Sequence, residues 1–377
     1  MRIVHVNDIV FGYAMGDHSA RGGAERYAWH LLRELANAGW SVTVGVRFKM
    51  QPGEEKVIAG VRFLGMSRES HFLLDWFKLL KQVKPDWCLW QCADYMWGPA
   101  AQIARWLGVR TAFSTMHDRD VQPRKALNLR KSWWPLYVWG LRRSNLILVQ
   151  HQGQRDQLPA LLQGRAYSLP GIVSLPSTVI PHSERSGSVA WVAVIRPVKR
   201  LDRLIEIARR LPMVRFMVCG APATGLWDRK ALELILEQLQ SLPNVDYRGH
   251  VDPEESLRII GNANLLLSTS DGEGFPSVFL EAWAAGTPVV SVEIDPDHKI
   301  QNHGLGIVAN TIEGTGEAVR SLMASPQRCQ DLGVKARHHV EQFYSASVAV
   351  HAFEKAAASV SDGRGMVMHS TNQDGAV

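Results

Sequence analysis

Cysteine is scarce in this sequence. Only 4 of the 377 residues are cysteine, and no Cys-x-x-Cys pair occurs, so we expect no disulfide framework and a reducing compartment. Cys88 and Cys92 could bind a metal, but their apolar surroundings favour a strand with two buried thiols.

Long hydrophobic runs are also absent. No stretch of about eighteen apolar residues occurs, which argues against a membrane-spanning helix. The amino terminus begins directly with a strand pattern and lacks the segments of a signal peptide. These absences predict a cytoplasmic protein.

Length and charge narrow the possibilities further. The chain is long enough for two domains, each with its own core. Its formal net charge of +6 would suit nucleic acid, an anionic membrane or an anionic small ligand. None of the common nucleic-acid-binding motifs is present, so we expect no nucleic-acid partner.

Short β-branched runs alternate with helical patterns along the chain, which is typical of parallel sheets with crossover helices. Strands are expected at 3–6, 41–46, 87–90, 110–114, 146–149, 189–195, 215–219, 245–248, 265–268 and 288–292. Helices in the second half are expected at 202–211, 228–242, 253–261, 278–285, 312–323 and about 327–360.

A stretch rich in proline, serine and glycine, 164–188, divides this pattern and predicts a linker. We therefore expect an α/β protein with two Rossmann-like domains facing a cleft, 1–170 and 171–342. Ligands of such sheets bind outside the carboxyl ends of the strands. The polar end of the chain, 361–377, is expected to be a disordered tail.

Two acids, Glu273 and Glu281, are separated by seven residues and flank the loop Gly274-Phe275-Pro276-Ser277. Ser277 is predicted to cap the helix that follows, with Glu281 about one turn inside. A helix start favours an anion, whereas carboxylates suit neutral sugar hydroxyls, so the pair points to a nucleotide-sugar. A capped surface helix with two solvated glutamates would show the same spacing.

The string from Glu273 to Val290 closely resembles the signature of the retaining glycosyltransferase family 4, E-G-F-P-x-x-x-x-E followed by A-x-A-x-G-x-P-V-V. The resemblance extends over nearly the whole chain in motif order. It implies the GT-B fold, with a last helix at about 343–360 that packs back onto the first domain.

The activity implied by this resemblance is retaining, metal-independent transfer of a sugar from a nucleotide-diphospho-sugar to an acceptor hydroxyl. The acceptor would be a polysaccharide or a lipid-linked glycan precursor, and no cofactor is expected. Glu281 would hold the ribose and Glu273 the transferred sugar. The rest of this donor loop would be formed by Gly274, Phe275, Pro276, Ser277 and Val278.

Basic residues follow the first strand of the second domain. Arg196 and Lys199 form either a solvated turn or a cation pair for a diphosphate. Glycosyltransferase family 4, which this sequence resembles, carries Arg-x-x-x-x-Lys here, but the position five before Lys199 is Val194. Lys199 is therefore matched directly, and Arg196 is expected to substitute for the missing arginine. Both would stabilise the leaving diphosphate in place of a metal.

Two candidate positions lie in the first domain. Gly22 and Gly23 are expected at the start of a helix, where they either form a flexible cap or let a diphosphate come close to the backbone. They resemble the G-G-x-E motif of the family. His117 ends a strand and is either structural or, as the resemblance implies, close to the sugar or the acceptor. The strings Asp118-Arg-Asp120 and Asp295-Pro-Asp297 are expected by chance, so no metal ligands are predicted.

The segment 124–143 interleaves basic and aromatic residues, which suits an anionic membrane surface at the inner face of the membrane. A core helix with a basic solvent face is the alternative. Three other activities also remain open: a GT-B nucleotide-sugar epimerase, a sugar phosphorylase, and a non-catalytic nucleotide-sugar-binding protein.

Overall fold

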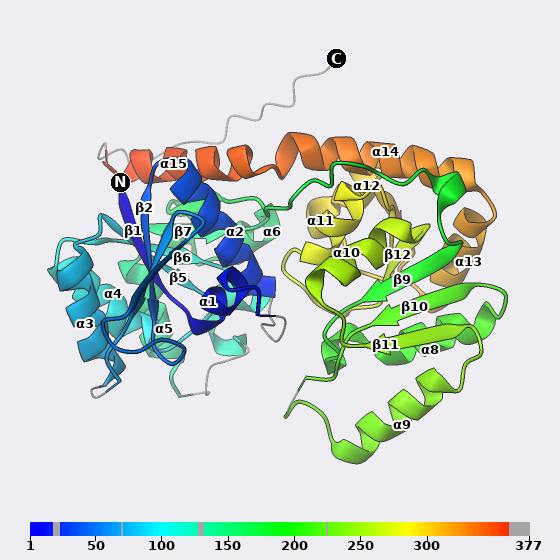
Figure 1. The fold of residues 1–377 in the computed structure, drawn as a ribbon, viewed down its shortest axis with the longest axis horizontal. Coiled ribbons are helices and arrows are strands. Elements are labelled where there is room, and N and C mark those ends of the chain that lie inside the picture. Colours follow the sequence, from blue (N-terminus) through cyan, green and yellow to red (C-terminus); the bar gives the residue numbers. More distant parts are fainter. Residues whose placement is uncertain (18–22, 69–70, 127–131, 224, 362–377) are drawn as a thin grey trace. The chain divides into compact units, whose positions relative to one another are not determined.

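The computed structural model describes residues 1–17, 23–68, 71–126, 132–223 and 225–361. The chain forms two compact units (Figure 1). Unit 1 comprises Met1–Pro170 and Ala349–Val377, and unit 2 comprises Gly171–Val348.

Unit 1 contains an eight-stranded sheet in the order β3-β4-β2-β1-β5-β6-β7-β8. Its pairs are parallel except for the antiparallel hairpin of β3 and β4. The strands are β1 Arg2–Val6, β2 Ser41–Val46, β3 Glu55–Ile58, β4 Val61–Gly65, β5 Trp87–Gln91, β6 Arg110–Ser114, β7 Leu146–Val149 and β8 Ala166–Ser168. The helices are α1 Asp8–Ala14, α2 Gly23–Asn37, α3 Phe72–Val83, α4 Trp97–Trp106, α5 Trp134–Arg143, α6 Gln152–Gln157 and α7 Ala160–Gln163, followed at the end of the chain by α15 Ala346–Ser361.

The helices of unit 1 pack their apolar faces against the sheet. In α2 the buried residues recur at helical spacing and face the sheet. On the sheet's other face α3, α4 and α5 lie together (Figure 1) and form one core cluster around Trp76, Trp97 and Phe113. At the end of the chain, α15 packs on unit 1, where Phe353 contacts Trp40 at a ring-centroid distance of 5.4 Å.

Unit 2 contains a six-stranded parallel sheet in the order β11-β10-β9-β12-β13-β14. The strands are β9 Ser188–Val192, β10 Arg215–Cys219, β11 Val245–Gly249, β12 Leu265–Ser268, β13 Val289–Ser291 and β14 Gly306–Val308. The helices are α8 Leu201–Arg210, α9 Arg229–Gln240, α10 Pro253–Asn262, α11 Ser277–Ala284, α12 Lys299–His303, α13 Ile312–Met323 and α14 Pro326–Phe343.

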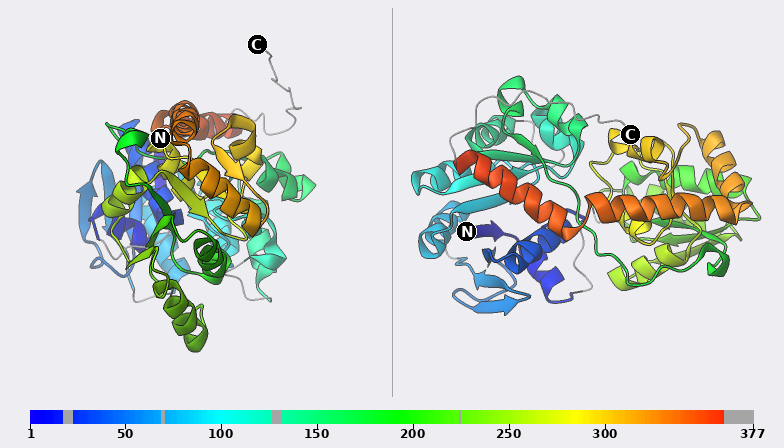
Figure 2. Two further views of the ribbon diagram at one scale, coloured as in Figure 1. Left: turned by 90° about the vertical axis from the view of Figure 1, so that its right-hand side faces the viewer. Right: turned by 90° about the horizontal axis from the view of Figure 1, so that it is seen from above.

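Two apolar clusters hold the two faces of this sheet. One joins the sheet to α8 and α13 and includes Leu204 and Val319. The other joins it to α10, α11 and α14 and includes Ile260 and Trp283. The further views in Figure 2 show the helices of unit 2 distributed over both faces, as expected for a parallel sheet that is buried on both sides.

Several predicted elements need correction. The strands β3, β4, β8 and β14 were not predicted, and β8 occupies part of the expected linker at 164–188. The expected strand at 189–195 ends at Val192, and the helical pattern at 327–360 is divided into α14 and α15. The expected tail lies, except for Ser361, outside the described residues. Within the described residues, no helix combines the length and hydrophobicity needed to cross a membrane.

Candidate functional site

The carboxyl ends of β9 and β12 define the candidate site in unit 2. These strands are neighbours, but the chain leaves β9 toward β10 on one side and returns to β12 on the other. Such a reversal of strand order opens a crevice for ligands. The two following loops are joined there, because Asp271 N donates to Val198 O (2.9 Å) and Thr269 Oγ1 donates to Lys199 O (2.7 Å).

Lys199 and Glu273 meet at this point. The Lys199 ammonium and the Glu273 carboxylate form a direct ion pair. Their side chains are 20% and 17% exposed, respectively, so both remain accessible to a ligand. The structure thus brings together two predicted site residues that are far apart in the sequence.

A second group of ion pairs surrounds this contact. Arg203 contacts Asp271 (2.8 Å) and Glu293 (3.0 Å). Arg200 contacts Asp202 (2.7 Å) and Asp271 (3.0 Å), and the bond to Asp202 is the main reason that the pKa of Arg200 lies above its usual value. Arg200 also adopts a left-handed backbone with φ of 51°, which is strained for a side chain of this size.

Arg196 differs from these arginines. It is exposed and lies just before the 3-10 turn Pro197–Lys199. No partner of its guanidinium is found within the described part of the chain. Arg196 is therefore a cation of this loop that is available to an anionic ligand without first breaking an ion pair.

The helix α11 presents the second predicted glutamate. Glu281 is its fifth residue, one turn inside as predicted, and is 7% exposed. The prediction that Ser277 caps this helix was wrong, because Pro276 occupies the cap position and Ser277 is already the first helical residue. Proline holds the entry extended, with φ of −63° and ψ of 116°.

The other loop residues have mixed environments. Gly274 and Pro276 are buried, and Val278 is partly buried. Phe275 is 8% exposed, with its ring 5.3 Å from that of Tyr344 and 6.1 Å from that of Trp283. Its aromatic contacts therefore anchor the loop on the core of unit 2.

Arg185 supports α11 from its carboxyl end, and the sequence did not point to it. Its guanidinium donates to the carbonyl oxygens of Ala285 (2.9 Å), Gly286 (3.2 Å) and Ala263 (2.9 Å). It also donates to Ile180 O and to Thr287 Oγ1. Burial lowers the pKa of Arg185 to about 10, yet these carbonyls satisfy the charge. It lies in the predicted linker, where a single arginine gives no signal of burial.

His117 lies at the carboxyl end of β6 in unit 1, as predicted. Its Nδ1 accepts a bond from Arg119 N (3.0 Å), so the neutral ring carries its proton on Nε2. Gly23 is exposed at the first position of α2, and Gly22 lies outside the described residues.

The acids near His117 are occupied by protein groups. Asp120 is buried and accepts bonds from Ala93 N, Met116 N and His117 N, and desolvation raises its pKa. Asp118 accepts bonds from Gln154 and contacts His151 at 2.7 Å. In the described residues, no group of three or more His, Cys, Asp or Glu is placed to hold a metal ion.

The basic and aromatic segment 124–143 is partly built into unit 1. Tyr137 is buried, and its hydroxyl donates to Asp120 O (2.6 Å). The Trp133 ring packs 4.0 Å from that of Tyr95, and Arg124 lies over the Trp134 ring. Leu136 remains 40% exposed. Positions 127–131, which include Arg130 and Lys131, lie outside the described residues.

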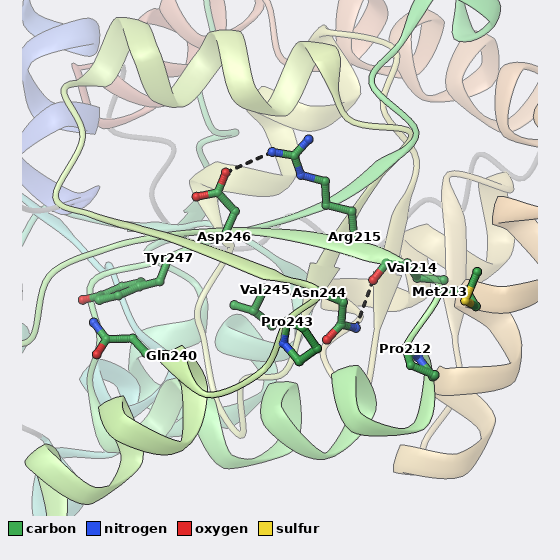
Figure 3. A pocket seen from close by; sticks show the side chains of 10 residues that line it. All are labelled: Pro212, Met213, Val214, Arg215, Gln240, Pro243, Asn244, Val245, Asp246 and Tyr247. Carbon is green, nitrogen blue, oxygen red and sulfur yellow. Dashed lines mark hydrogen bonds and ion pairs between the residues drawn. The ribbon is translucent and has the colours of Figure 1, made fainter.

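An open depression of about 690 Å³ lies at the amino ends of β10 and β11 (Figure 3). Pro212–Arg215 and Pro243–Tyr247 line it. It contains none of the predicted site residues and lies at the opposite end of these strands from the carboxyl edge. Its Arg215 and Asp246 already pair with each other at 3.1 Å, so it lacks the unpaired charge that the carboxyl edge offers.

Two protein-family models match this chain. Residues 179–339 match "Glycosyl transferases group 1", and residues 21–166 match "Glycosyltransferase Family 4". Among curated relatives, the D-inositol 3-phosphate glycosyltransferase of Rhodococcus erythropolis is 28% identical over 47% of this chain and 43% of its own length. That of Mycobacterium avium is 35% identical over 28% of this chain and 25% of its own length. The chain thus spans less than half the length of these relatives.

Solved structures of similar fold cover almost the whole chain. The sucrose-phosphate synthase of Thermosynechococcus elongatus superimposes with a TM-score of 0.74 and 16% identity, over 96% of this chain and 100% of that one. HepE of Anabaena, solved with UDP and glucose, superimposes with a TM-score of 0.72 and 13% identity, over 95% of this chain and 100% of that one. At such identities the likeness establishes the fold.

Proposed function

This chain belongs to the group 1 glycosyltransferases and has the GT-B fold, and on that premise we propose that it transfers a sugar from a nucleotide-diphospho-sugar to an acceptor hydroxyl. The observation that supports this function is the meeting of Lys199, Glu273 and the start of α11 at the strand-order reversal of unit 2.

The chemistry requires stabilisation of a leaving group. As the bond between the anomeric carbon and the diphosphate oxygen breaks, negative charge develops on the diphosphate. Lys199, Arg196 and the backbone N–H groups at the start of α11 stabilise that charge in the proposed mechanism, which needs no metal. Glu273 accepts hydrogen bonds from the sugar hydroxyls, and Glu281 accepts them from the ribose.

Retention of configuration is proposed from the family resemblance. A double displacement would need a carboxylate nucleophile, and no candidate for it is apparent in the sequence. In the proposed reaction the acceptor hydroxyl attacks the face that the diphosphate leaves, and a leaving phosphate oxygen takes its proton. His117, with Nε2–H as donor, would orient the sugar or the acceptor.

The donor site can be tested by a thermal-shift screen of UDP-, GDP- and ADP-sugars without added metal. UDP-glucose is the first choice because UDP and glucose occupy the similar HepE structure. We expect one donor class to raise the melting temperature, and Lys199→Ala and Glu281→Ala to abolish the shift. Lys230→Ala, on the exposed surface of α9, is the matched control. A full shift in Lys199→Ala would contradict the proposed site.

The proposed acceptor is a polysaccharide or a lipid-linked glycan precursor, presented at an anionic membrane surface that segment 124–143 contacts. The exposed Leu136 and Arg142 support this role. We expect the protein to float with anionic liposomes and to lose binding in a Leu136→Asp, Arg142→Glu variant. If the variant floated with the liposomes as well as the wild type does, the proposed contact with a membrane would be refuted.

A second candidate is a non-catalytic nucleotide-sugar-binding protein, which the valine at position 194 favours. The two functions differ in turnover. Release of nucleoside diphosphate that depends on an added acceptor would exclude the binding protein.

A further inference from the structure

The loops after β9 and β12, together with the start of α8 and Glu293 after β13, carry equal numbers of opposite charges. The cations are Arg196, Lys199, Arg200 and Arg203, and the carboxylates are Asp202, Asp271, Glu273 and Glu293. Only Arg196 among the four cations is without a carboxylate partner in the described residues. A diphosphate therefore enters a site whose positive charge is already largely neutralised by the protein.

The carboxylates of this cluster differ in what they hold. Asp271 accepts bonds from both Arg200 and Arg203, and its backbone N–H is bonded to Val198 O. It therefore ties the two loops together. Glu273, in contrast, contacts Lys199, the cation that the proposed reaction requires for the diphosphate. A ligand that binds the Lys199 ammonium breaks this ion pair, and the Glu273 carboxylate then needs another hydrogen-bonding partner.

We propose that Glu273 is a specificity-determining residue that favours the nucleotide-sugar over the free nucleoside diphosphate by competing for Lys199. This inference rests on the proposed glycosyl transfer. When the donor binds, its sugar hydroxyls give Glu273 new hydrogen bonds, and Lys199 is released to the diphosphate. After transfer the sugar is gone, so the carboxylate again competes for Lys199 and weakens the binding of the product.

The burial of the pair determines the size of this effect. Both side chains are largely shielded from solvent, so the contact is stronger than a fully exposed ion pair, yet water still screens part of it. A carboxylate that loses its ammonium partner without a replacement remains incompletely satisfied at a shielded position. Free nucleoside diphosphate offers no such replacement, whereas the sugar hydroxyls of the donor do.

The test is isothermal titration of wild-type protein and of Glu273→Gln with UDP, GDP, ADP and inorganic pyrophosphate. Glutamine keeps the shape of the side chain but removes its charge. We expect Glu273→Gln to bind the preferred nucleoside diphosphate roughly threefold to tenfold more tightly than the wild type. Its binding of the intact nucleotide-sugar and its turnover should fall, so that discrimination between donor and product is lost.

Two variants separate this role from a general change of charge. Asp271→Asn removes a carboxylate two residues away that does not contact Lys199, and should not tighten nucleoside diphosphate binding to the same degree. In a Lys199→Ala background, Glu273→Gln should give no tightening, because the cation for which Glu273 competes is absent. Such a double-mutant cycle isolates the pair.

The outcomes distinguish this inference from the function on which it rests. If the wild type binds a nucleoside diphosphate and Glu273→Gln binds it equally or more weakly, the competition is refuted while the donor site stands. If Asp271→Asn tightens binding as much as Glu273→Gln, the effect is general and the inference is also refuted. If neither protein binds any of the four probes, both the inference and the proposed donor site fail.

Discussion

Individual polar residues in this protein are often explained by partners that lie far away in the sequence. Asp118 and Asp120 form an Asp-x-Asp string, but their carboxylates have different partners. Asp120 accepts bonds from two backbone N–H groups after β6 and one after β5, and Asp118 bonds side chains at the start of α6. These contacts account for both carboxylates by backbone capping and loop packing.

The spacing of Glu273 and Glu281 was informative because both lie in one loop and helix. Their places before and within α11 could therefore be predicted from local sequence, with Lys199 added by the resemblance. The partners of these residues could not be inferred in the same way. The contact of Lys199 with Glu273 joins two loops, and that of Arg203 with Glu293 joins α8 to the segment after β13. These segments follow different strands, so only the sheet order reveals the contacts.

His339 should make stability depend on pH. It is 6% exposed, its Nε2 has no hydrogen-bond partner, and desolvation, assisted by His303, Lys299 and His338, lowers its pKa to about 4. As pH falls from 6.5 toward 4, the unfolded chain binds a proton at this site that the folded protein does not bind. The free energy of unfolding is therefore fully retained above pH 6.5 and falls across this window.

Between pH 7 and pH 5, we expect the free energy of unfolding to fall by about 1–2 kcal/mol less in His339→Phe than in the wild type. Phenylalanine keeps the ring contacts with Phe343 and Tyr344 and does not titrate. Urea unfolding at the two pH values measures the difference, with His351→Gln as an exposed control. An unchanged pH dependence in His339→Phe would show that this histidine does not contribute.

At the scale of elements, length and burial decide which strands the sequence reveals. The strands β2, β6, β7, β10 and β12 agree with their predicted ranges because they are hydrophobic runs bounded by clear breaks. The strand β3 is almost entirely exposed, so it lacks the buried alternation that identifies a strand. The strand β14 has only three residues, too few to show such a pattern, and it is defined by its pairing with β13.

Arg185 links two elements that the sequence treats separately. It bonds carbonyl oxygens at the carboxyl ends of α10 and α11, where a cation also interacts favourably with the helix dipole. We expect Arg185→Lys to lower the free energy of unfolding by about 2–3 kcal/mol, because an ammonium cannot reproduce the planar set of bonds.

Chemical denaturation of Arg185→Lys, followed by circular dichroism, measures this loss. Arg229→Lys is the matched control, since Arg229 is 90% exposed on α9. If both substitutions had equally small effects, the carbonyl contacts of Arg185 would contribute little to stability.

At the scale of the whole molecule, the two units follow one plan in different ways. Each has a largely parallel sheet, which the repeated αβ pattern of the sequence predicted, and each sheet also has a reversal of strand order, which the structure shows. The packing of α15 on unit 1 was expected only from the family resemblance, because the sequence pattern at 327–360 reads as one helix. It depends on particular contacts, such as the bond from Trp40 Nε1 to Glu354 (3.0 Å).

These assignments predict that the two units respond to different perturbations. Phe353 is fully buried in unit 1, so Phe353→Ala should lower the melting temperature of that unit by roughly 10 °C. Arg196, Lys199, Glu273 and Glu281 belong to unit 2, so the preferred nucleoside diphosphate at a hundredfold excess over its Kd should stabilise that unit by about 2.7 kcal/mol.

Differential scanning calorimetry can separate these two effects. We expect two transitions, of which one moves down in Phe353→Ala and the other moves up with nucleotide. Leu234→Ala, at a 56% exposed position on α9, should change neither. Movement of both transitions by the same amount under either perturbation would mean that the units unfold as one cooperative body. In that case the nucleotide would stabilise unit 1 as well, although the proposed contacts of Arg196 and Lys199 with its diphosphate and of Glu281 with its ribose belong to unit 2.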